Sequence, residues 1–415
     1  MRRGLLLKSG RGSRSPLHRS AEKQVNMLKA FQYRIYPTKP QQKQLDMLLE
    51  TARSLYNRAL AERRDAYQNA GKTLNYYDQA NQLKALRKED PYLAQLNFSA
   101  CQDVLRRLDK AFKAFFRRVK AGEKPGYPRF KGKGRYDSIT FPAYGDGCKV
   151  KADRLYVQHV GLLKVKWHRP LEGQIKTVTI RRKVDQWFVS FACEVEPTPL
   201  APCDAAVGID LGVKHLAISS DGEFYEHPKY LRQSERKLKR KQRAVSRKQK
   251  SSSRRRKAVR ELARLHGHIA NQRKDYAHKI SRKLVNRYHL IAFEDLHVQG
   301  MARNRPLAKS IVDAAWSQLV QFTTYKAAEA GRRVVRVDPK NTTQLCSRCG
   351  KLVPKPLSER IHRCEHCGYV QDRDVNAAQN ILKRALASRC FQARAEPSGH
   401  NVDGCVMRVP RSRLL

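Results

Sequence analysis

The sequence predicts an α/β multidomain protein: an antiparallel β-barrel with a helical insertion, followed by a mixed α/β core into which a cysteine module is inserted. Three observations predict this fold class. Apolar residues recur with a helical period in some segments and at every second position in others. Four cysteines form two close pairs near the C-terminus. Acidic residues, which are scarce in this chain, stand where apolar strands end and where the last helix begins.

The composition indicates a globular protein with a polyanionic partner. A chain of 415 residues can form two to four domains with hydrophobic cores. Hydrophobic residues make up 40%, which excludes wholesale disorder. Because 86 Lys and Arg face 37 Asp and Glu, the net charge is +49, and such a surface repels itself unless polyanions neutralise it. We therefore expect nucleic acid, bound mainly through its phosphates, with an anionic membrane as the competing partner.

A membrane or secretory location is not favoured by the sequence. No apolar run approaches the roughly 18 residues that a spanning helix needs. The basic N-terminal segment has an apolar core of only Leu5 to Leu7, too short for a secretory signal. We expect a soluble intracellular protein, and residues 1–26, rich in Arg and Ser, are predicted to be a disordered and dispensable extension.

Residues 27–200 are predicted to form the barrel. Phe31, Tyr33 and Ile35 alternate on one face of the first strand, and from about Gly126 the same period of two returns. Between these strands, about residues 40–122, two segments have apolar residues at helical spacing. We interpret them as a helical insertion, and the proline-rich "EPTPLAPCDA" as the hinge after the barrel.

The second half is predicted to begin with a core over residues 201–340. "AAVGIDLGVKHLAISSDGEFY" predicts three strands, and about 229–288 a basic helical hairpin broken at serines 251–253. "YHLIAFEDL" predicts a buried strand, "SIVDAAWSQLVQFTTYKAAEAG" one amphipathic helix and "RRVVRVDP" a further strand. The cysteine module spans 341–370, the last helix 371–387, and the aperiodic tail 388–415 is expected to be flexible.

The cysteine spacing is C-x2-C, fourteen residues, then C-x2-C. Each pair bends a short loop so that two thiolates face one ion, and Gly350 and Gly368 permit the turn that follows each pair. In a reducing compartment this pattern favours a structural zinc over disulfides. His362 and His366 could substitute, but the set of cysteines is already complete. The predicted ligands are Cys346, Cys349, Cys364 and Cys367.

The acidic residues suggest a second metal site. Asp210 ends the strand "AAVGID", Glu294 ends "LIAFE", and Asp372 and Asp374 precede the last helix. Carboxylates at strand ends in so basic a protein suit divalent cations held against a phosphodiester. Taken singly, each residue could instead be a turn former, an ordinary charge at a strand end or a helix N-cap. Taken together, the order β-β-β, helix, β, helix, β, helix matches an RNase H-like core, which brings three such carboxylates together.

These residues closely resemble the TnpB family of insertion-sequence proteins, which is related to compact type V CRISPR effectors. The resemblance rests on "GIDLG", "FEDL", "NRPLAKSIVDAAWSQL", "YKAAEAGRRVVRVDPKNTTQLCSRCG" and "DRDVNAAQNI", with "KPGYPRFKGKG" in the first half, and covers about residues 27–385. It implies RNA-guided DNA cleavage by a RuvC-like nuclease domain, with a guide RNA from the element's own end and target double-stranded DNA as partners. It also implies a prokaryotic, nucleoid-associated location.

Position by position, the resemblance implies that Asp210, Glu294 and Asp374 are catalytic and hold two Mg²⁺. Asp295 would point to the opposite face of its strand, and Asp372 would cap the helix or support the site. The four cysteines would hold the zinc of a module that binds the target nucleic acid. The basic residues expected to line the RNA–DNA channel are Lys237, Lys239, Arg240, Lys241, Arg243, Arg247, Lys248, Arg254, Arg255 and Arg256.

Alternatives to these assignments stay open at the level of sequence. A run of charges is normally a solvated helix face, although few acids compensate residues 232–260. A transposase that transfers DNA strands on the same fold, or an inactive nucleic-acid-binding regulator, would share most features. A zinc-ribbon factor would explain charge and zinc but not the carboxylates. Six aromatic residues are candidates for stacking on bases, although most are expected in the core: Tyr33, Tyr36, Phe130, Tyr136, Trp167 and Trp187.

Overall fold

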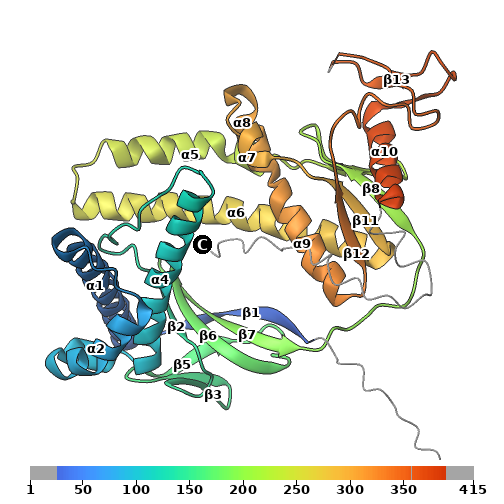
Figure 1. Ribbon diagram of the computed structural model, residues 1–415. Coiled ribbons are helices and arrows are strands. Elements are labelled where there is room, and N and C mark those ends of the chain that lie inside the picture. Colours follow the sequence, from blue (N-terminus) through green and yellow to red (C-terminus); the bar gives the residue numbers. More distant parts are fainter. Residues whose placement is uncertain (1–25, 357, 389–415) are drawn as a thin grey trace, which may run out of the picture.

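The computed structural model describes residues 26–356 and 358–388. The predictions for residues 1–26 and 388–415 therefore fall, except for Asn26 and Ser388, outside the described residues. The described residues form two large sheets with helices around them, and a small two-stranded sheet of β13 (Ile361–Arg363) and β14 (Val370–Asp372) (Figure 1). Within the described part, no helix is both long enough and apolar enough to cross a membrane.

The first sheet has seven antiparallel strands in the order β2-β6-β7-β1-β5-β4-β3. Alternate residues of these strands share one buried core, as the period of two predicts. The strands are β1 (Met27–Tyr36), β2 (Ser138–Phe141), β3 (Cys148–Lys151), β4 (Arg154–Val157), β5 (Gly161–Lys166), β6 (Gln174–Lys183) and β7 (Gln186–Val195).

The predicted barrel is not closed by strand pairing, because the described hydrogen bonds end at β2 on one edge and β3 on the other. Helix α4 (Phe98–Lys120) bridges the two edges instead. It packs against β2, while its N-cap residue Asn97 donates to Asp146 Oδ1 (2.9 Å) and Gln158 Oε1 (3.0 Å), which flank β3 and β4. A helix therefore completes the enclosure that we predicted to be formed by strands alone.

Four helices lie between β1 and β2 in the sequence. Thr38 and Gln41 form a capping box at the start of α1, and Gly71 ends it at a φ of 61°. The predicted apolar stripe of α4 is buried only as far as Leu108, because Phe116 and Val119 project into solvent beyond the core. The helices are α1 (Lys39–Ala70), α2 (Tyr76–Glu89), α3 (Pro91–Gln95) and α4 (Phe98–Lys120).

The second sheet has the order β10-β9-β8-β11-β12, in which β8, β11 and β12 are parallel and the other pairs antiparallel. The predicted three-strand meander is present. Helices α6 and α9 share a core with one face of this sheet, and α10 packs on the other face. The strands are β8 (Ala206–Asp210), β9 (His215–Ser219), β10 (Phe224–Glu226), β11 (Leu290–Glu294) and β12 (Arg333–Val337).

The predicted basic hairpin is α5 and α6, which extend together away from the second sheet (Figure 1). The prediction of a single helix after β11 is wrong. The chain forms two helices there, because the helical conformation is interrupted at Ala315, whose φ is 53°. This break starts α9 at Trp316, which is buried and donates to the carbonyl of Gly212 at 3.2 Å. The helices are α5 (Tyr230–Ser246), α6 (Ser253–Arg287), α7 (Val298–Met301), α8 (Arg305–Ala314), α9 (Trp316–Glu329) and α10 (Arg373–Ala387).

Candidate metal sites and nucleic-acid interface

Asp210 and Glu294 lie at the same edge of the second sheet. They end the adjacent parallel strands β8 and β11, in which Phe293 is opposite Ile209. Parallel strands that end together place their last side chains side by side. Only 7% of Asp210 and 8% of Glu294 is exposed. The fold therefore buries two carboxylates next to each other, as their positions in the sequence predict.

Helix α10 brings the third carboxylate to this edge. The helix lies directly on β8 because residue 208 is glycine: a Cβ there would be 2.0 Å from the carbonyl oxygen of Ala378. No side chain fits at this distance, so the glycine in "VGID" sets how closely α10 approaches the strand that carries Asp210. The first turn of α10 holds Asp374, with an exposed side-chain fraction of 13%.

The cap of α10 is Asp372, not Asp374. Its Oδ1 accepts the backbone N–H groups of Asp374 (2.9 Å) and Val375 (3.2 Å). The alternative interpretation of Asp374 as a simple N-cap is therefore wrong, and its carboxylate instead accepts hydrogen bonds from arginine side chains. Arg373 Nε donates to one oxygen at 3.0 Å and Arg360 NH1 to the other at 3.4 Å.

Burial and neighbouring groups alter the ionisation of two of these acids, Asp210 and Glu294. Burial and the neighbouring charges of Glu294 and Asp374 raise the pKa of Asp210 well above its usual value. Burial also raises the pKa of Glu294, although Thr342 Oγ1 donates to it at 2.5 Å. Among the three acids, Asp210 is the one whose pKa responds to the charges of both others. Its environment therefore disfavours the ionised form unless a cation binds.

The donor set at this edge suits divalent cations. Carboxylate oxygens are the ligands that Mg²⁺ prefers, and burial next to like charges leaves the group short of positive charge. The three carboxylates are not gathered around one point: among the described residues, only four cysteines bring ligand atoms within 4.8 Å of one another.

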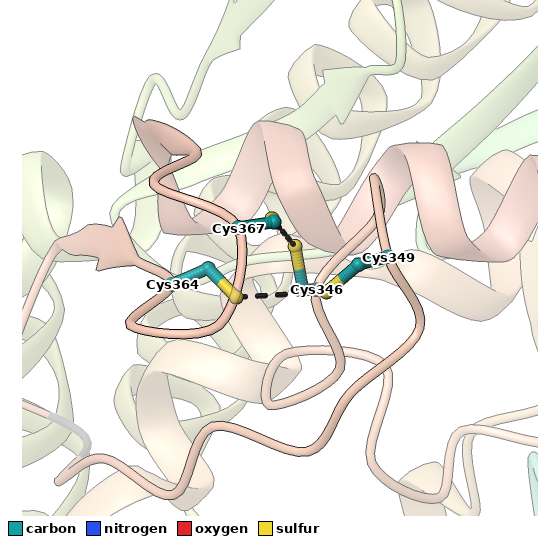
Figure 2. A group of neighbouring side chains, drawn as sticks. All are labelled: Cys346, Cys349, Cys364 and Cys367. Carbon is teal, nitrogen blue, oxygen red and sulfur yellow. Dashed lines mark hydrogen bonds between the residues drawn. The ribbon is translucent and has the colours of Figure 1, made fainter.

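The four predicted cysteine ligands converge, and they point toward one another from two loops in Figure 2. Cys346 Sγ lies 3.7 Å from Cys367 Sγ, and Cys349 Sγ lies 3.6 Å from Cys364 Sγ. A tetrahedral zinc with Zn–S bonds of about 2.3 Å requires sulfurs about 3.8 Å apart. The geometry therefore fits a structural zinc. The described cysteines form no disulfide, in agreement with the prediction.

Hydrogen bonds join the cysteine module to α10, the helix that carries Asp374. Asn376 of α10 accepts the backbone N–H of Ser347 (2.8 Å) and donates to the carbonyl of Leu345 (2.8 Å). Asn380, one helical turn later, donates to the carbonyls of Leu345 (2.7 Å) and Thr342 (2.9 Å). The sequence analysis missed these residues, although two asparagines four apart in "VNAAQN" were a visible signal of a polar helix face.

Six of the ten basic residues predicted to bind nucleic acid, those at positions 237 to 247, lie on two faces around α5. The other four, Lys248, Arg254, Arg255 and Arg256, lie at the turn between α5 and α6 and in the first turn of α6. A continuous face of α5 is formed by Arg236, Lys239, Arg240, Arg243 and Arg247. The opposite face, with Lys237 and Lys241, adjoins α6. Lys241 is paired with Glu261 (2.9 Å) and Lys239 with Glu235 (3.1 Å), so these two are partly neutralised. Arg236, absent from the predicted set, belongs to the exposed face because it lies one turn before Lys239 and Arg240.

Most of the predicted stacking aromatics are unavailable to bases. Tyr33, Tyr136 and Trp187 are buried in the core of the first sheet. Trp167 is partly buried, and its Nε1 donates to the carbonyl of Asp153. Tyr36 and Phe130 are 43% and 49% exposed. The expectation that core packing claims the majority is confirmed.

Comparisons with known proteins identify the family. Three family models match: "Helix-turn-helix domain" over residues 27–72, "Probable transposase" over 190–305 and "Cas12f1-like, TNB domain" over 316–381. A "Putative RNA-guided DNA endonuclease" of Streptomyces pristinaespiralis is 36% identical over 367 residues, which cover 87% of this chain and 90% of the relative. The chain belongs to the TnpB family. A second relative, the "Putative RNA-guided DNA endonuclease InsQ" of Escherichia coli K12, is 31% identical over 94% of this chain and 97% of its own length.

The fold of this TnpB-family chain is also found in a solved effector. The structure titled "Cryo-EM structure of the Cas12f1-sgRNA-target DNA complex" aligns with a TM-score of 0.56 and 14% identity, over 86% of this chain and 99% of that chain. At this identity the likeness shows a common fold. One description does not fit the structure: residues 27–72 form a strand and one continuous helix, α1, instead of a helix-turn-helix.

Proposed function

We propose that this protein is an RNA-guided DNA endonuclease of a transposable element, which cuts target DNA by metal-dependent hydrolysis of a phosphodiester. The observation that carries the proposal is the convergence of Asp210, Glu294 and Asp374 at one sheet edge in a chain of net charge +49. Relatives over almost the whole chain bear the name of RNA-guided DNA endonucleases. Buried acids in a protein that attracts polyanions support metal-dependent chemistry on a phosphate backbone.

The three acids have distinct roles under this proposal. Asp210, which interacts with both other carboxylates, would be shared between two Mg²⁺, and Glu294 and Asp374 would each complete the ligands on one side. When bound, such ions supply a water of lowered pKa and stabilise the leaving oxygen. Thr342 holds one oxygen of Glu294, and the cap at Asp372 fixes the first turn that carries Asp374. The residues thus orient the acids before any ion binds.

The proposed partners are a guide RNA from the element's end and target double-stranded DNA. The exposed face of α5 provides arginines without acidic partners in the described structure, which suits a phosphate backbone held by shape and charge. The cysteine module would hold one structural zinc and contact the target strand. The solved effector that shares the fold is named as a complex with guide RNA and target DNA, which supports the same two partners here.

Two other functions make different predictions about the purified protein. A transposase that transfers strands would use the same carboxylates but would join element ends to target DNA without a bound RNA. An inactive regulator would bind RNA or DNA but need no carboxylates, and the retention of all three argues against it. A discrete RNA bound to the purified protein would therefore exclude the transposase. Cleavage of target DNA would exclude the inactive regulator.

The deciding experiment compares wild type with Asp210→Ala and Asp295→Asn. RNA that co-purifies with each protein is sequenced, and a DNA target that matches the guide is incubated with Mg²⁺. Wild type and D295N should cut, because the Asp295 side chain is 63% exposed and lies outside the acid group. D210A should carry the same RNA without cutting. Cleavage by D210A would refute the assignment of the site, and the absence of any discrete RNA would refute RNA guidance.

A further inference from the structure

A short segment of the chain, residues 342–347, lies between the two candidate metal sites, and we call it the bridging segment. Its first residue, Thr342, donates through Oγ1 to Glu294 of the acid group. Cys346, one of the four cysteines that converge, belongs to the same segment. Thr342 is 2% and Cys346 1% exposed, so both are buried. The residue that holds Glu294 and a candidate zinc ligand are therefore close neighbours in the sequence and in the fold.

Two buried asparagines of α10 hold the bridging segment by its backbone. Asn380 is 6% exposed, and its Nδ2 donates to the carbonyls of Thr342 (2.9 Å) and Leu345 (2.7 Å). Asn376 is completely buried; it donates to the carbonyl of Leu345 at 2.8 Å and accepts the backbone N–H of Ser347 at 2.8 Å. Buried amides with these partners cannot move without losing hydrogen bonds, so the segment is fixed on α10.

Two more side chains of α10 bind the cysteine module on the same helix face. Gln379 accepts from Ser347 Oγ at 2.7 Å, and Lys383 donates to the carbonyl of the same serine. With the two asparagines, they have the spacing i, i+3, i+4, i+7 of one side of a helix. Ile381 and Ala385 pack instead on strands of the second sheet. Helix α10 therefore contacts the module on one side and the sheet that carries the acids on the other.

The cysteine module has little apolar packing of its own. None of the hydrophobic clusters formed by the described residues includes a residue of 341–370. Its two strands have three residues each, and the aliphatic side chains of Ile361 and Val370 are 47% and 58% exposed. Zinc bound by the four cysteines would therefore supply much of the folding free energy of the module. Loss of the ion would release the cysteine loops and, through Cys346, the bridging segment.

We propose that the bridging segment couples the zinc site to the acid group, so that zinc binding positions Glu294 and thereby raises the affinity of the acids for Mg²⁺. Asn380 is the positioning residue of this coupling, because it holds the carbonyl of Thr342, whose hydroxyl donates to Glu294. Two ligands that stabilise the same arrangement favour each other's binding, and this coupling is reciprocal. The proposal rests on the proposed function, which assigns Mg²⁺ to the acids, and on zinc at the cysteines.

The test measures Mn²⁺ binding to full-length protein by electron paramagnetic resonance of the free ion, because Mn²⁺ prefers the same oxygen ligands as Mg²⁺. Nucleic acid is first removed in high salt, since phosphates also bind the ion. Asp210→Asn measures binding outside the acid group, and this background is subtracted. Wild type, Asn380→Leu and Gln379→Met are each measured with zinc and after its removal. Gln379→Met is the matched control, because it removes hydrogen bonds between α10 and the module but leaves the carbonyl of Thr342 bonded.

The three proteins should respond differently to the removal of zinc. In wild type, Mn²⁺ binding at the acid group should weaken about 10- to 100-fold, the usual effect of losing a group that orients a metal ligand. N380L should bind Mn²⁺ weakly with or without zinc, while metal analysis still finds zinc at its cysteines. Q379M should respond as wild type does. In cleavage assays with guide RNA, N380L should need more Mg²⁺ but approach the wild-type rate at saturation, whereas a misfolded fraction would lower the rate at every Mg²⁺ concentration.

Equal Mn²⁺ affinity in wild type with and without zinc would overturn the proposal, and this comparison needs no variant that could fail to fold. An undiminished effect of zinc in N380L would overturn it as well. Where removal of zinc unfolds the protein, zinc-loaded N380L and Q379M decide, since only N380L should bind Mn²⁺ weakly.

The two premises fail in ways that can be told apart. If wild type binds no more Mn²⁺ than D210N, the proposed function of the acid group is wrong. If wild type as purified holds no zinc, the zinc assignment is wrong. Either result also overturns the coupling.

Discussion

The carboxylate of Asp372 accepts the backbone N–H of Asp374 at 2.9 Å and so caps α10, whereas the carboxylate of Asp374 pairs with arginines and acts through its charge on Asp210. The two residues have the same side chain but different partners. Asp372 satisfies backbone donors at the helix terminus. Asp374 lies close enough to Asp210 for its charge to raise the pKa of that residue. Asp372 therefore stabilises the start of the helix, and Asp374 is the acid that we propose for the chemistry.

This difference predicts opposite results for the same substitution. Asp374→Asn should abolish cleavage, because an amide is a poor ligand for Mg²⁺ in place of a carboxylate. Asp372→Asn should keep most of the activity, since Asn caps helices as well as Asp does. Asp372→Ala should lower the free energy of unfolding by about 1 kcal/mol. Cleavage assays and thermal melts on the three variants check this, and an active D374N would contradict the proposed role.

The site was predictable because chemistry there requires particular residue types at particular places. Thiolates at C-x2-C spacing and carboxylates at strand ends have few other uses in so basic a chain. The four cysteine sulfurs lie within 4.8 Å of one another, and the charges of Glu294 and Asp374 act on Asp210. The pattern of residues alone could not show which of Asp372 and Asp374 caps the helix. Both precede an apolar helix, and only the dihedral angles at the helix start show which side chain points back to the backbone.

The strands and helices were predictable where neighbouring residues in the sequence show an apolar pattern. Features that depend on contacts between distant residues were less predictable. The strands of the first sheet follow the period of two, whereas β8, β9 and β11 of the second sheet are buried at nearly every position and were predicted from their continuous apolar runs. The closure of the barrel depends on Asn97, whose amide contacts residues 49 and 61 positions away in the sequence. The break at Ala315 likewise depends on Trp316 reaching Gly212, 104 residues earlier. Neither contact leaves a periodic signal in the chain.

Thr342 is predicted to position Glu294. Its hydroxyl donates to Glu294 Oε1 at 2.5 Å, and it is itself only 2% exposed. Thr342→Val keeps the shape of the side chain but removes the donor, so Glu294 is less firmly held. We expect cleavage to fall about 10- to 100-fold and to need more Mg²⁺. Rates measured across Mg²⁺ concentrations check this. Thr342→Ser keeps the hydroxyl and should restore the wild-type Mg²⁺ dependence, whereas a T342V protein with wild-type rates would refute the role.

The α5 surface is predicted to contribute through its unpaired arginines more than through its paired lysines. Arg240→Gln with Arg243→Gln should weaken binding of nucleic acid and reduce the slope of log K against log salt by about 1.5, since each lost phosphate contact contributes about 0.7 to 0.9. Lys239→Gln with Lys241→Gln should have a smaller effect, because these lysines already pair with Glu235 and Glu261. Binding titrations at several salt concentrations check both. Equal slopes for the two double variants would contradict the division.

The acid group is predicted to cost stability until a metal binds. The raised pKa of Asp210 shows that its surroundings disfavour the ionised form, chiefly through burial and then through the charges of Glu294 and Asp374. Asp210→Asn removes that charge at nearly constant volume. In buffer without Mg²⁺ and without chelator, so that zinc is retained, D210N should melt at a higher temperature than wild type. Mg²⁺ should then raise the melting temperature of wild type, because a ligand that binds only the folded state stabilises it, by about 2.7 kcal/mol at 100 times its Kd. D210N should not respond, and Asp295→Asn should respond as wild type does. If Mg²⁺ stabilised D210N as much as wild type, the ions would bind elsewhere and the central role of Asp210 would be wrong.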